Sequence, residues 1–344
     1  MAQPTALETV MRTEFLPKLE DQVFSYSYWL EKLRGMTKTQ TGGTGYNKKL
    51  VIAKNPNTGS YEPYGTFRAN PADKVTYATV GWKHYYQNIP ISNIELLMNK
   101  GQQDKTKITD ILQTEFEVAE SSLKEIFAAD IYSDGAEYAY PAGSAESVSP
   151  IYGLKYWVNE NRTAGGITSS ASSNTWWNAQ VIAAGSPSFT EMTTASDADF
   201  ICKRLRQGIG EATVGSETPD VIITTRIIWE GLATVADGYQ KMEKTRVGKG
   251  SYNEATKANM GWEAIMFDNV PVIWDSFCPG GYAYGLNTNF WEVRALAGAN
   301  MNMTPLEKVS GGDTKQATIL MSWNMMCYKP SRQFVITALP TAYA

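Results

Sequence analysis

Two long extended segments that run directly into a long amphipathic helix constrain this chain more than any other feature. The strand-forming segments are Tyr46–Lys54 and Val75–Ile91, and a loop rich in Gly, Pro and Asn, Asn55–Asp73, separates them. Apolar residues then recur at steps of one, three and four between Ile108 and Ile131, which predicts one helix from about Asp104 to Ile131, about 42 Å long. Its apolar stripe consists of Ile108, Ile111, Leu112, Phe116, Ala119, Leu123, Ile126, Phe127 and Ile131. Such a hairpin has little core of its own, so we expect it to lie on another copy of the same chain.

The composition favours a globular protein that contacts other proteins. A chain of 344 residues suffices for one large or two moderate domains, and 43% of the residues are hydrophobic against 19% charged. Tyr and Trp number 19 and 10, and these residues carry much of the energy of protein–protein contacts. A large aromatic core would account for the same composition, and both interpretations stay open. The net charge of −4 is unlike that of proteins that hold nucleic acid through their own charge, which are usually basic.

Cysteine usage and hydropathy bear on the compartment. Cys202, Cys278 and Cys327 are far apart and odd in number, and they match neither a zinc spacing nor a disulfide framework. A reducing compartment is therefore expected. Met1–Arg12 has no apolar core of a signal peptide, and no run of 18 apolar residues occurs. We expect neither secretion nor a membrane partner.

The titratable residues do not form a recognisable catalytic or metal-binding pattern. His84 is the only histidine, which excludes multi-histidine zinc sites, and it stands on an expected strand, where a single histidine is usually structural. The segment Gly42–Lys48 lacks the spacing of a phosphate-binding loop and is expected to be a flexible connector. Cys202 has the setting of a packed thiol. We expect no catalytic residue, no cofactor and no metal. Carboxylate pairs such as Asp197 and Asp199 suit a helix start, but they leave a soluble carboxylate-dependent hydrolase open as an alternative.

Three further segments frame the hairpin and the long helix. Phe15–Arg34 has apolar residues on one side and is predicted to be a short helix, and the polar, glycine-rich Gly35–Gly45 is predicted to be a connector. After the long helix, Gly135–Pro150 contains several Gly and Pro residues, and we place a domain boundary there.

The second half of the chain alternates helical and strand patterns before it turns to strands. A helix is predicted after Ser196, Pro219–Thr225 has the pattern of a buried strand, and a second helix follows near Arg226–Ala236. The polar segment Tyr239–Met260 is predicted to be a mobile loop. The strands expected after it are Trp262–Phe267 and Val270–Trp274, joined at Asp268-Asn269, then Tyr282–Leu286, and finally Gln316–Tyr328 paired with Arg332–Leu339.

Short stretches in a fixed order carry a family resemblance over nearly the whole chain. They are Ile89-Pro90-Ile91-Ser92, Asn99-Lys100-Gly101, Tyr152-Gly153-Leu154, Gly165-Gly166-Ile167, Trp176-Trp177, Pro219–Ile223, Phe267–Asp275, Tyr282–Asn287 and Lys329–Gln333. In this order, behind the hairpin and the helix, they resemble the major capsid proteins of tailed bacteriophages, which have the Hong Kong 97-type shell fold. No single motif is specific, and the order carries the resemblance.

The resemblance implies an α+β fold with an N-terminal arm, an extended hairpin called the E-loop, a peripheral domain with a long spine helix, and an axial α/β domain. The implied boundaries are 1–45 for the arm and connector, 46–93 for the E-loop, 94–149 for the peripheral domain, 150–275 for the axial domain, and 276–344 for return strands of the peripheral domain.

The same resemblance implies a structural function. Hexamers and pentamers of the chain would form an icosahedral head, in the virion and assembled in the host cytoplasm. The implied partners are other copies of the chain, a separate scaffolding protein, a portal, decoration proteins, and packaged double-stranded DNA bound without sequence specificity. An encapsulin-type compartment shell is the alternative with the same fold. A fused scaffolding segment and a Lys–Asn cross-link, which some relatives carry, are not visible in this sequence.

Aromatic side chains in the arm and at the hairpin tip are the expected contacts with neighbouring copies, and packing within the own subunit is the alternative for each. The candidates are Tyr26, Tyr28 and Trp29 in the arm, and Tyr61, Tyr64, Phe67 and Arg68 at the tip.

Overall fold

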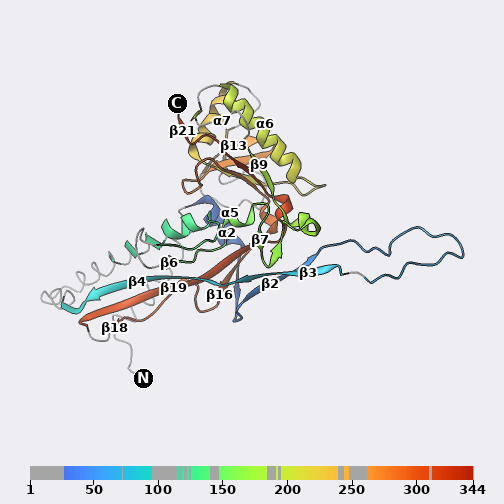
Figure 1. The fold of residues 1–344 in the computed structure, drawn as a ribbon. Helices are drawn as coiled ribbons and strands as arrows, with labels where there is room; N and C mark the ends of the chain where they lie inside the picture. The colour runs from blue at the N-terminus through green and yellow to red at the C-terminus, as the bar shows by residue number, and fades with distance from the viewer. Residues whose placement is uncertain are drawn as a thin grey trace.

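The computed structural model is a mixed α+β structure. It describes residues 27–71, 73–94, 115, 118–119, 122–123, 125–139, 147–183, 191–192, 195–238, 244–247, 262–309 and 312–343. Two sheets organise it, one below the other in Figure 1, and a long hairpin projects from the side of the molecule. Within the described part of the chain, no helix is long and apolar enough to cross a membrane.

The first sheet is built on one long strand, and we call it the β19 sheet. β19 (Thr314–Cys327) pairs along one edge with β4 (Lys83–Ser92). Along its other edge it pairs in turn with β16 (Trp291–Leu296), β17 (Asn302–Met303) and β18 (Glu307–Lys308), all antiparallel. β1 (Thr37–Gln40) extends the sheet in parallel with β16.

Apolar residues on one face of the β19 sheet form the core beneath two helices. α2 (Tyr28–Met36) lies against β16, and the rings of Trp29 and Trp291 meet edge to face at 5.5 Å. The described residues between 115 and 130 are helical, and Ala119, Leu123 and Phe127 are buried together with Ile131, as the apolar stripe predicts. The stripe residues Ile108, Ile111, Leu112 and Phe116 lie outside the described residues.

The second sheet has seven strands, and we call it the β11 sheet. Its order is β12 (Lys244–Val247), β13 (Trp262–Phe267), β14 (Val270–Trp274), β11 (Val221–Thr224), β15 (Ala283–Leu286), β20 (Phe334–Thr337) and β9 (Gln180–Ala183). α6 (Ala195–Ala212) and α7 (Arg226–Gly238) cover one face, and the opposite face packs on the core shared with the β19 sheet. The strand β11 is buried on both faces, with Ile222 toward the helices and Ile223 toward the shared core.

Short elements connect these layers. They are β5 (Tyr138–Ala139), β6 (Ser147–Val148), α5 (Leu154–Trp157), β7 (Thr163–Ala164), β8 (Ile167–Thr168), η1 (Ser172–Trp177), β10 (Glu191–Met192), η3 (Thr288–Phe290), η4 (Pro330–Arg332) and β21 (Ala342–Tyr343).

Several sequence predictions agree with these elements. The expected hairpin across Asp268-Asn269 forms as β13 and β14, and both turn residues have positive φ, of 46° and 66°, as a two-residue hairpin turn requires. The predicted strand Pro219–Thr225 corresponds to β11, and the predicted helix near Arg226 to α7. The first part of the helix expected at Phe15–Arg34 lies outside the described residues, and the described helix begins at Tyr28.

Three of the predicted segments differ from the structure. The expected single strand Val75–Ile91 is two strands, because the chain leaves β3 (Val75–Gly81) at Trp82 and β4 joins β19 instead of the hairpin. The expected connector contains β1, and the expected mobile loop Tyr239–Met260 contains β12. Both are short polar strands at a sheet edge, where little apolar patterning is required.

The last expected strand pair is also wrong. β19 and β20 lie in different sheets, because η4 at Pro330 carries the chain from one sheet to the other. The range 276–344 is therefore divided: β15 and β20 belong to the β11 sheet, and β16 to β19 belong to the β19 sheet.

Candidate intersubunit surface

The base of the projecting hairpin is packed onto its own subunit. β2 (Gly45–Val51) and β3 pair antiparallel in register from Gly45↔Gly81 to Val51↔Val75. One face of this pair packs on the core, and its buried apolar residues are Tyr46, Leu50, Ala78 and Val80, with the half-buried Lys48 on the same face. The period-two alternation along both strands places this face on the core.

An ion cluster fixes the hairpin base to the β19 sheet. The Lys48 ammonium lies 2.9 Å from Oε2 of Glu292 on β16, and Arg294 donates to Oε1 of the same carboxylate at 2.7 and 2.9 Å. Burial alone would raise the pKa of Glu292, but the hydrogen bonds from Lys48 and Arg294 outweigh it and hold the pKa below its usual range. The Glu292 carboxylate is thus charged at neutral pH and holds β2 over β16.

A buried amide joins the hairpin to two other parts of the chain. The Asn324 side chain donates to the Gly81 carbonyl at 2.7 Å and accepts from the Tyr152 N–H at 3.2 Å. The Tyr46 hydroxyl donates to the Asn324 carbonyl at 3.2 Å. Because Asn324 is fully buried, losing any of these partners would leave a polar group unsatisfied.

A small hairpin of β7 and β8 contacts the outer edge of β3. The Thr79 N–H donates to the Gly165 carbonyl at 2.9 Å. Gly165 has φ of 60°, and a Cβ there would lie 3.0 Å from the Cβ of Ala78. A glycine is therefore required at this contact, both for the backbone conformation and for the close approach.

The tip of the hairpin has almost no contact with its own subunit. Figure 1 shows it continuing from β2 and β3 as an extended loop far beyond the other elements. Every described residue from 53 to 71 is exposed apart from the half-buried Asn57, whose side chain bridges to the Asn70 backbone at 2.9 Å in both directions. The exposed fraction is 70% for Tyr61, 106% for Tyr64 and 76% for Phe67.

The aromatic side chains at the tip form a small apolar patch in a segment without a core. The rings of Tyr61 and Phe67 meet at 5.2 Å, and Tyr64 has φ of 73° beside a turn in which Gly65 N–H donates to the Glu62 carbonyl. Ordering a residue costs roughly 1–2 kcal/mol of backbone entropy. With so little surface buried within the subunit, this exposed apolar patch is a candidate for contact with another molecule.

The described arm candidates are buried, unlike the candidates at the tip. Tyr28 and Trp29 are fully buried in α2 against their own subunit, so they are withdrawn as intersubunit contacts. The helical periodicity turns both inward, and the alternative of packing within the subunit holds for them. Tyr26 lies outside the described residues. Tyr61, Tyr64, Phe67 and Arg68 are all exposed and remain contact candidates.

Sequence reasoning missed a second exposed apolar set next to the tip. Val51, Val75 and Tyr77 lie on the face of the hairpin base opposite the buried one, and their exposed fractions are 78%, 40% and 58%. Val51 and Val75 are direct cross-strand partners. The signal was available, because once Leu50 and Val80 are assigned inward the strand period places these three side chains outward.

The described titratable residues have structural surroundings. His84 Nδ1 lies 2.8 Å from the Ser322 hydroxyl across the β4–β19 pair, and the three cysteines are buried free thiols. Burial raises the pKa of Asp130, which accepts hydrogen bonds of 2.7 Å from the hydroxyls of Tyr85 and Tyr138. No group of three or more His, Cys, Asp or Glu that could hold a metal occurs among the residues described.

No family model and no curated protein matches the sequence. Solved structures match nearly its whole length. The capsid asymmetric unit of cyanophage A-1(L) has a TM-score of 0.67 at 13% identity, covering 92% of this chain and 93% of that chain. The capsid of the native GTA particle has a TM-score of 0.51 at 9% identity, covering 89% of each chain. The holo-SrpI encapsulin complex of Synechococcus elongatus has a TM-score of 0.50 at 10% identity, covering 92% of this chain and 89% of that chain.

The matches over nearly the whole chain define the class of the structure. The chain has the Hong Kong 97-type shell fold of phage capsid proteins.

Proposed function

We propose that this chain is the major capsid protein of a tailed bacteriophage. Many copies assemble, as hexamers and pentamers, into the icosahedral head that encloses double-stranded DNA. The observation that carries the proposal is a whole-chain shell fold combined with a projecting tip whose aromatic side chains are exposed in the single subunit. The likeness to structural capsid proteins supports a structural rather than a catalytic role.

The proposed mechanism separates a fixed base from a docking tip. The base is held by its buried face, by the Lys48–Glu292 pair and by Asn324, so it sets the direction in which the tip projects. The tip, with Tyr61, Phe67 and neighbouring residues, lies on an adjacent copy and excludes water there. Repeated around a ring, such contacts bury an area large enough for stable association.

The remaining parts of the proposal concern domains and partners. Residues 46–93 form the E-loop with the first strand of the peripheral domain, and the β11 sheet with α6 and α7 forms the axial domain. The inner surface of the shell meets DNA without reading its sequence. A separate scaffolding protein guides assembly in the host cytoplasm, and a portal and decoration proteins complete the head. Curvature is poorly specified by identical contacts alone, which favours a separate guide.

Truncation of the tip tests the function directly. Replacing Thr58–Asn70 by a short Gly linker removes residues with little burial in the subunit, so the subunit should fold with an unchanged unfolding transition but form no shells. A length-matched variant with Tyr61→Ser and Phe67→Ser should likewise fold normally but assemble poorly. Negative-stain electron microscopy and sedimentation read out assembly. Normal shells from the truncated chain would contradict the proposal.

An encapsulin-type compartment is the second candidate, and the likeness to the SrpI encapsulin complex favours it specifically. The two functions differ in what the shell encloses. Particles purified from the native source should contain double-stranded DNA if the chain is a phage capsid protein, and cargo protein without genomic DNA if it forms a compartment. Nuclease-protected nucleic acid measured after particle disruption separates the two.

A further inference from the structure

Two short links carry the chain between the β19 sheet and the β11 sheet, and they lie side by side. Residues 287–290 connect β15 to β16, and residues 328–333 connect β19 to β20. The Tyr328 N–H donates to the Phe290 carbonyl at 3.1 Å. The buried Gln333 side chain accepts from the Asn287 N–H at 2.7 Å and donates to the Asn287 carbonyl at 3.3 Å. The two links therefore behave as one joint.

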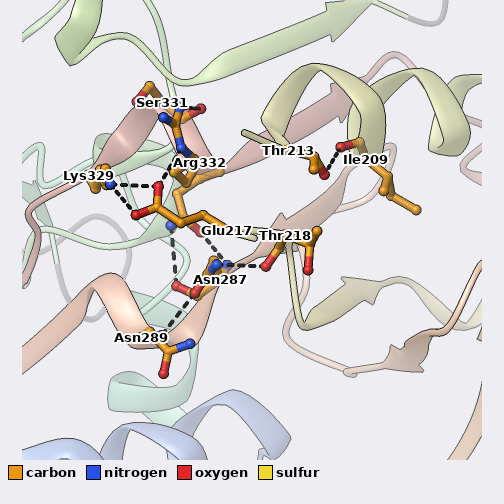
Figure 2. Close-up of polar contacts among 10 residues, drawn as sticks. Ile209, Thr213, Glu217, Thr218, Asn287, Asn289, Lys329, Ser331 and Arg332 are labelled. Carbon is orange, nitrogen blue, oxygen red and sulfur yellow. Dashed lines mark hydrogen bonds and ion pairs between the residues drawn. The ribbon is translucent and has the colours of Figure 1, made fainter. Parts of the chain in front are cut away.

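A third segment, residues 217–220 between α6 and β11, contacts both links (Figure 2). Oε2 of Glu217 lies 2.6 Å from the Lys329 ammonium and 2.9 Å from Nε of Arg332, so one carboxylate holds two cations of the second link. The Thr218 carbonyl accepts from the Asn287 side chain at 2.6 Å. Asp220 accepts from the Thr288 N–H at 3.0 Å.

The charge of Glu217 is suited to this position. Hydrogen bonds from Lys329, and then from Arg332, hold its pKa below the usual range. The Lys329 ammonium also lies 4.7 Å from the centre of the Phe290 ring, which belongs to the first link. Removing the carboxylate would leave Lys329 and Arg332 without the counter-charge that they share.

We infer that residues 217–220, with Glu217 as the central group, brace the joint and fix the angle between the two sheets. The apolar core between the sheets is shared, but apolar contact is non-directional and permits a range of angles. Hydrogen bonds and ion pairs at set geometry select one of them. A subunit with a fixed angle presents its contact surfaces in one relative orientation. This consequence for shell curvature rests on the proposed function, whereas the brace itself does not.

The test measures the angle in the unassembled subunit. Spin labels at Tyr86→Cys on β4 and Gln207→Cys on α6 report the distance between the two sheets, and the three native cysteines are buried. In the Glu217→Gln background we expect a broader distance distribution or a shifted mean. Glu230→Gln is the matched control, because Glu230 is equally exposed, at 34%, and pairs with Arg226 at 2.6 Å away from the joint. It should leave the distribution unchanged.

An unchanged distribution in folded Glu217→Gln protein would overturn the brace. If that variant fails to fold, Lys329→Gln keeps the Glu217–Arg332 pair and should give a smaller broadening; no broadening there would overturn the brace as well. Particle diameters measured by electron microscopy then test the consequence for curvature. If the wild-type chain forms no particles, the proposed function fails, but the distance measurement on the subunit still decides the brace.

Discussion

The base and the tip of the projecting hairpin belong to the same pair of strands, yet they are stabilised in opposite ways. The base buries Tyr46, Leu50, Ala78 and Val80 and is tied down by an ion cluster and a buried amide. The tip exposes Tyr61, Tyr64 and Phe67, and the contacts described for it, such as the bridge between Asn57 and Asn70, lie within the loop itself. The base is thus part of the folded subunit, whereas the described tip residues are exposed and, under the proposed function, a neighbouring copy orders them.

Under the proposed function, this difference has a consequence for assembly. A subunit can fold completely before it meets another copy, because none of the tip residues contributes to its core. The cost of ordering the tip is then met at docking, which lowers the affinity of each single contact. Weak single contacts let misplaced subunits dissociate, and only closed rings of many contacts are stable. The predictions below test whether base and tip really separate in this way.

The largest expected effect comes from placing a charge in the buried face of the base. Val80 is 1% exposed, so Val80→Asp should destabilise the subunit by about 3–5 kcal/mol, because an unpaired carboxylate would be buried. Val75→Asp on the same strand is the matched control, since Val75 is 40% exposed. It should change the free energy of unfolding by less than about 1 kcal/mol. Urea unfolding followed by circular dichroism measures both, and a stable Val80→Asp subunit would show that the base is not part of the core.

A smaller effect is expected from the ion cluster at the base. Glu292→Gln removes the charge that Lys48 and Arg294 share, and hydrogen bonds to charged groups contribute about 1.5–3 kcal/mol. Lys48→Met should cost less, because Lys48 is more exposed than Glu292 and Arg294 keeps its contact. Unfolding free energies of the two variants and of the double variant give the coupling. Additive losses would show that the cluster does not hold the hairpin.

Local patterns in the sequence predicted where the hairpin strands and the loop between them lie, because strand alternation and turn residues are encoded within a few positions, but they did not reveal that β3 ends at Gly81 and that β4 joins β19. The alternation at Tyr46, Leu50, Ala78 and Val80 sets the buried face, and the Gly, Pro and Asn residues of the loop mark the tip. The stripe that contains Leu123 and Phe127 predicted, for the same reason, which of the described helical residues between 115 and 130 are buried.

Pairing between distant segments could not be predicted in this way. The parallel pairing of β1 with β16 joins Thr37 to Val293, and the separation of β19 from β20 depends on which sheet each strand completes. Neither leaves a local signal. The same limit explains why Tyr28 and Trp29 were predicted to contact a neighbouring copy. An aromatic pattern on a short helix does not reveal which side faces the core, and both side chains face inward. The brace at Glu217 joins three segments far apart in the chain and was equally hidden.

The pH dependence of stability distinguishes base from tip further. The pKa of Glu292 is lowered in the folded subunit, so its contribution is fully present above the pKa of an unfolded glutamate, about 4.3, and is lost as the pH falls through the lowered folded value. Wild-type stability should therefore decline below about pH 4 more steeply than that of Glu292→Gln. Urea unfolding at pH 7, 5 and 3.5 measures the two slopes. Parallel slopes would contradict the assignment of this charge to the base.

The smallest change in the free energy of unfolding is expected at the tip. The tip therefore gives the clearest contrast with the base. Tyr61→Ala and Phe67→Ala remove large side chains, which in a core would cost about 3–5 kcal/mol each. Here both rings are exposed, so the double variant should change the free energy of unfolding by less than about 0.5 kcal/mol.

The same double variant should lose most of its assembly, because the two rings form the apolar centre of the proposed contact between the tip and a neighbouring copy. Arg68→Lys serves as the control for a change that keeps the charge at the tip. Unfolding of the isolated subunit and sedimentation of assembled particles are measured on the same preparations. A large loss of subunit stability would mean that the tip folds back on its own chain in solution, and full assembly would mean that its aromatic side chains are not the contact. Only an unchanged subunit that fails to assemble agrees with a tip that a neighbouring copy completes.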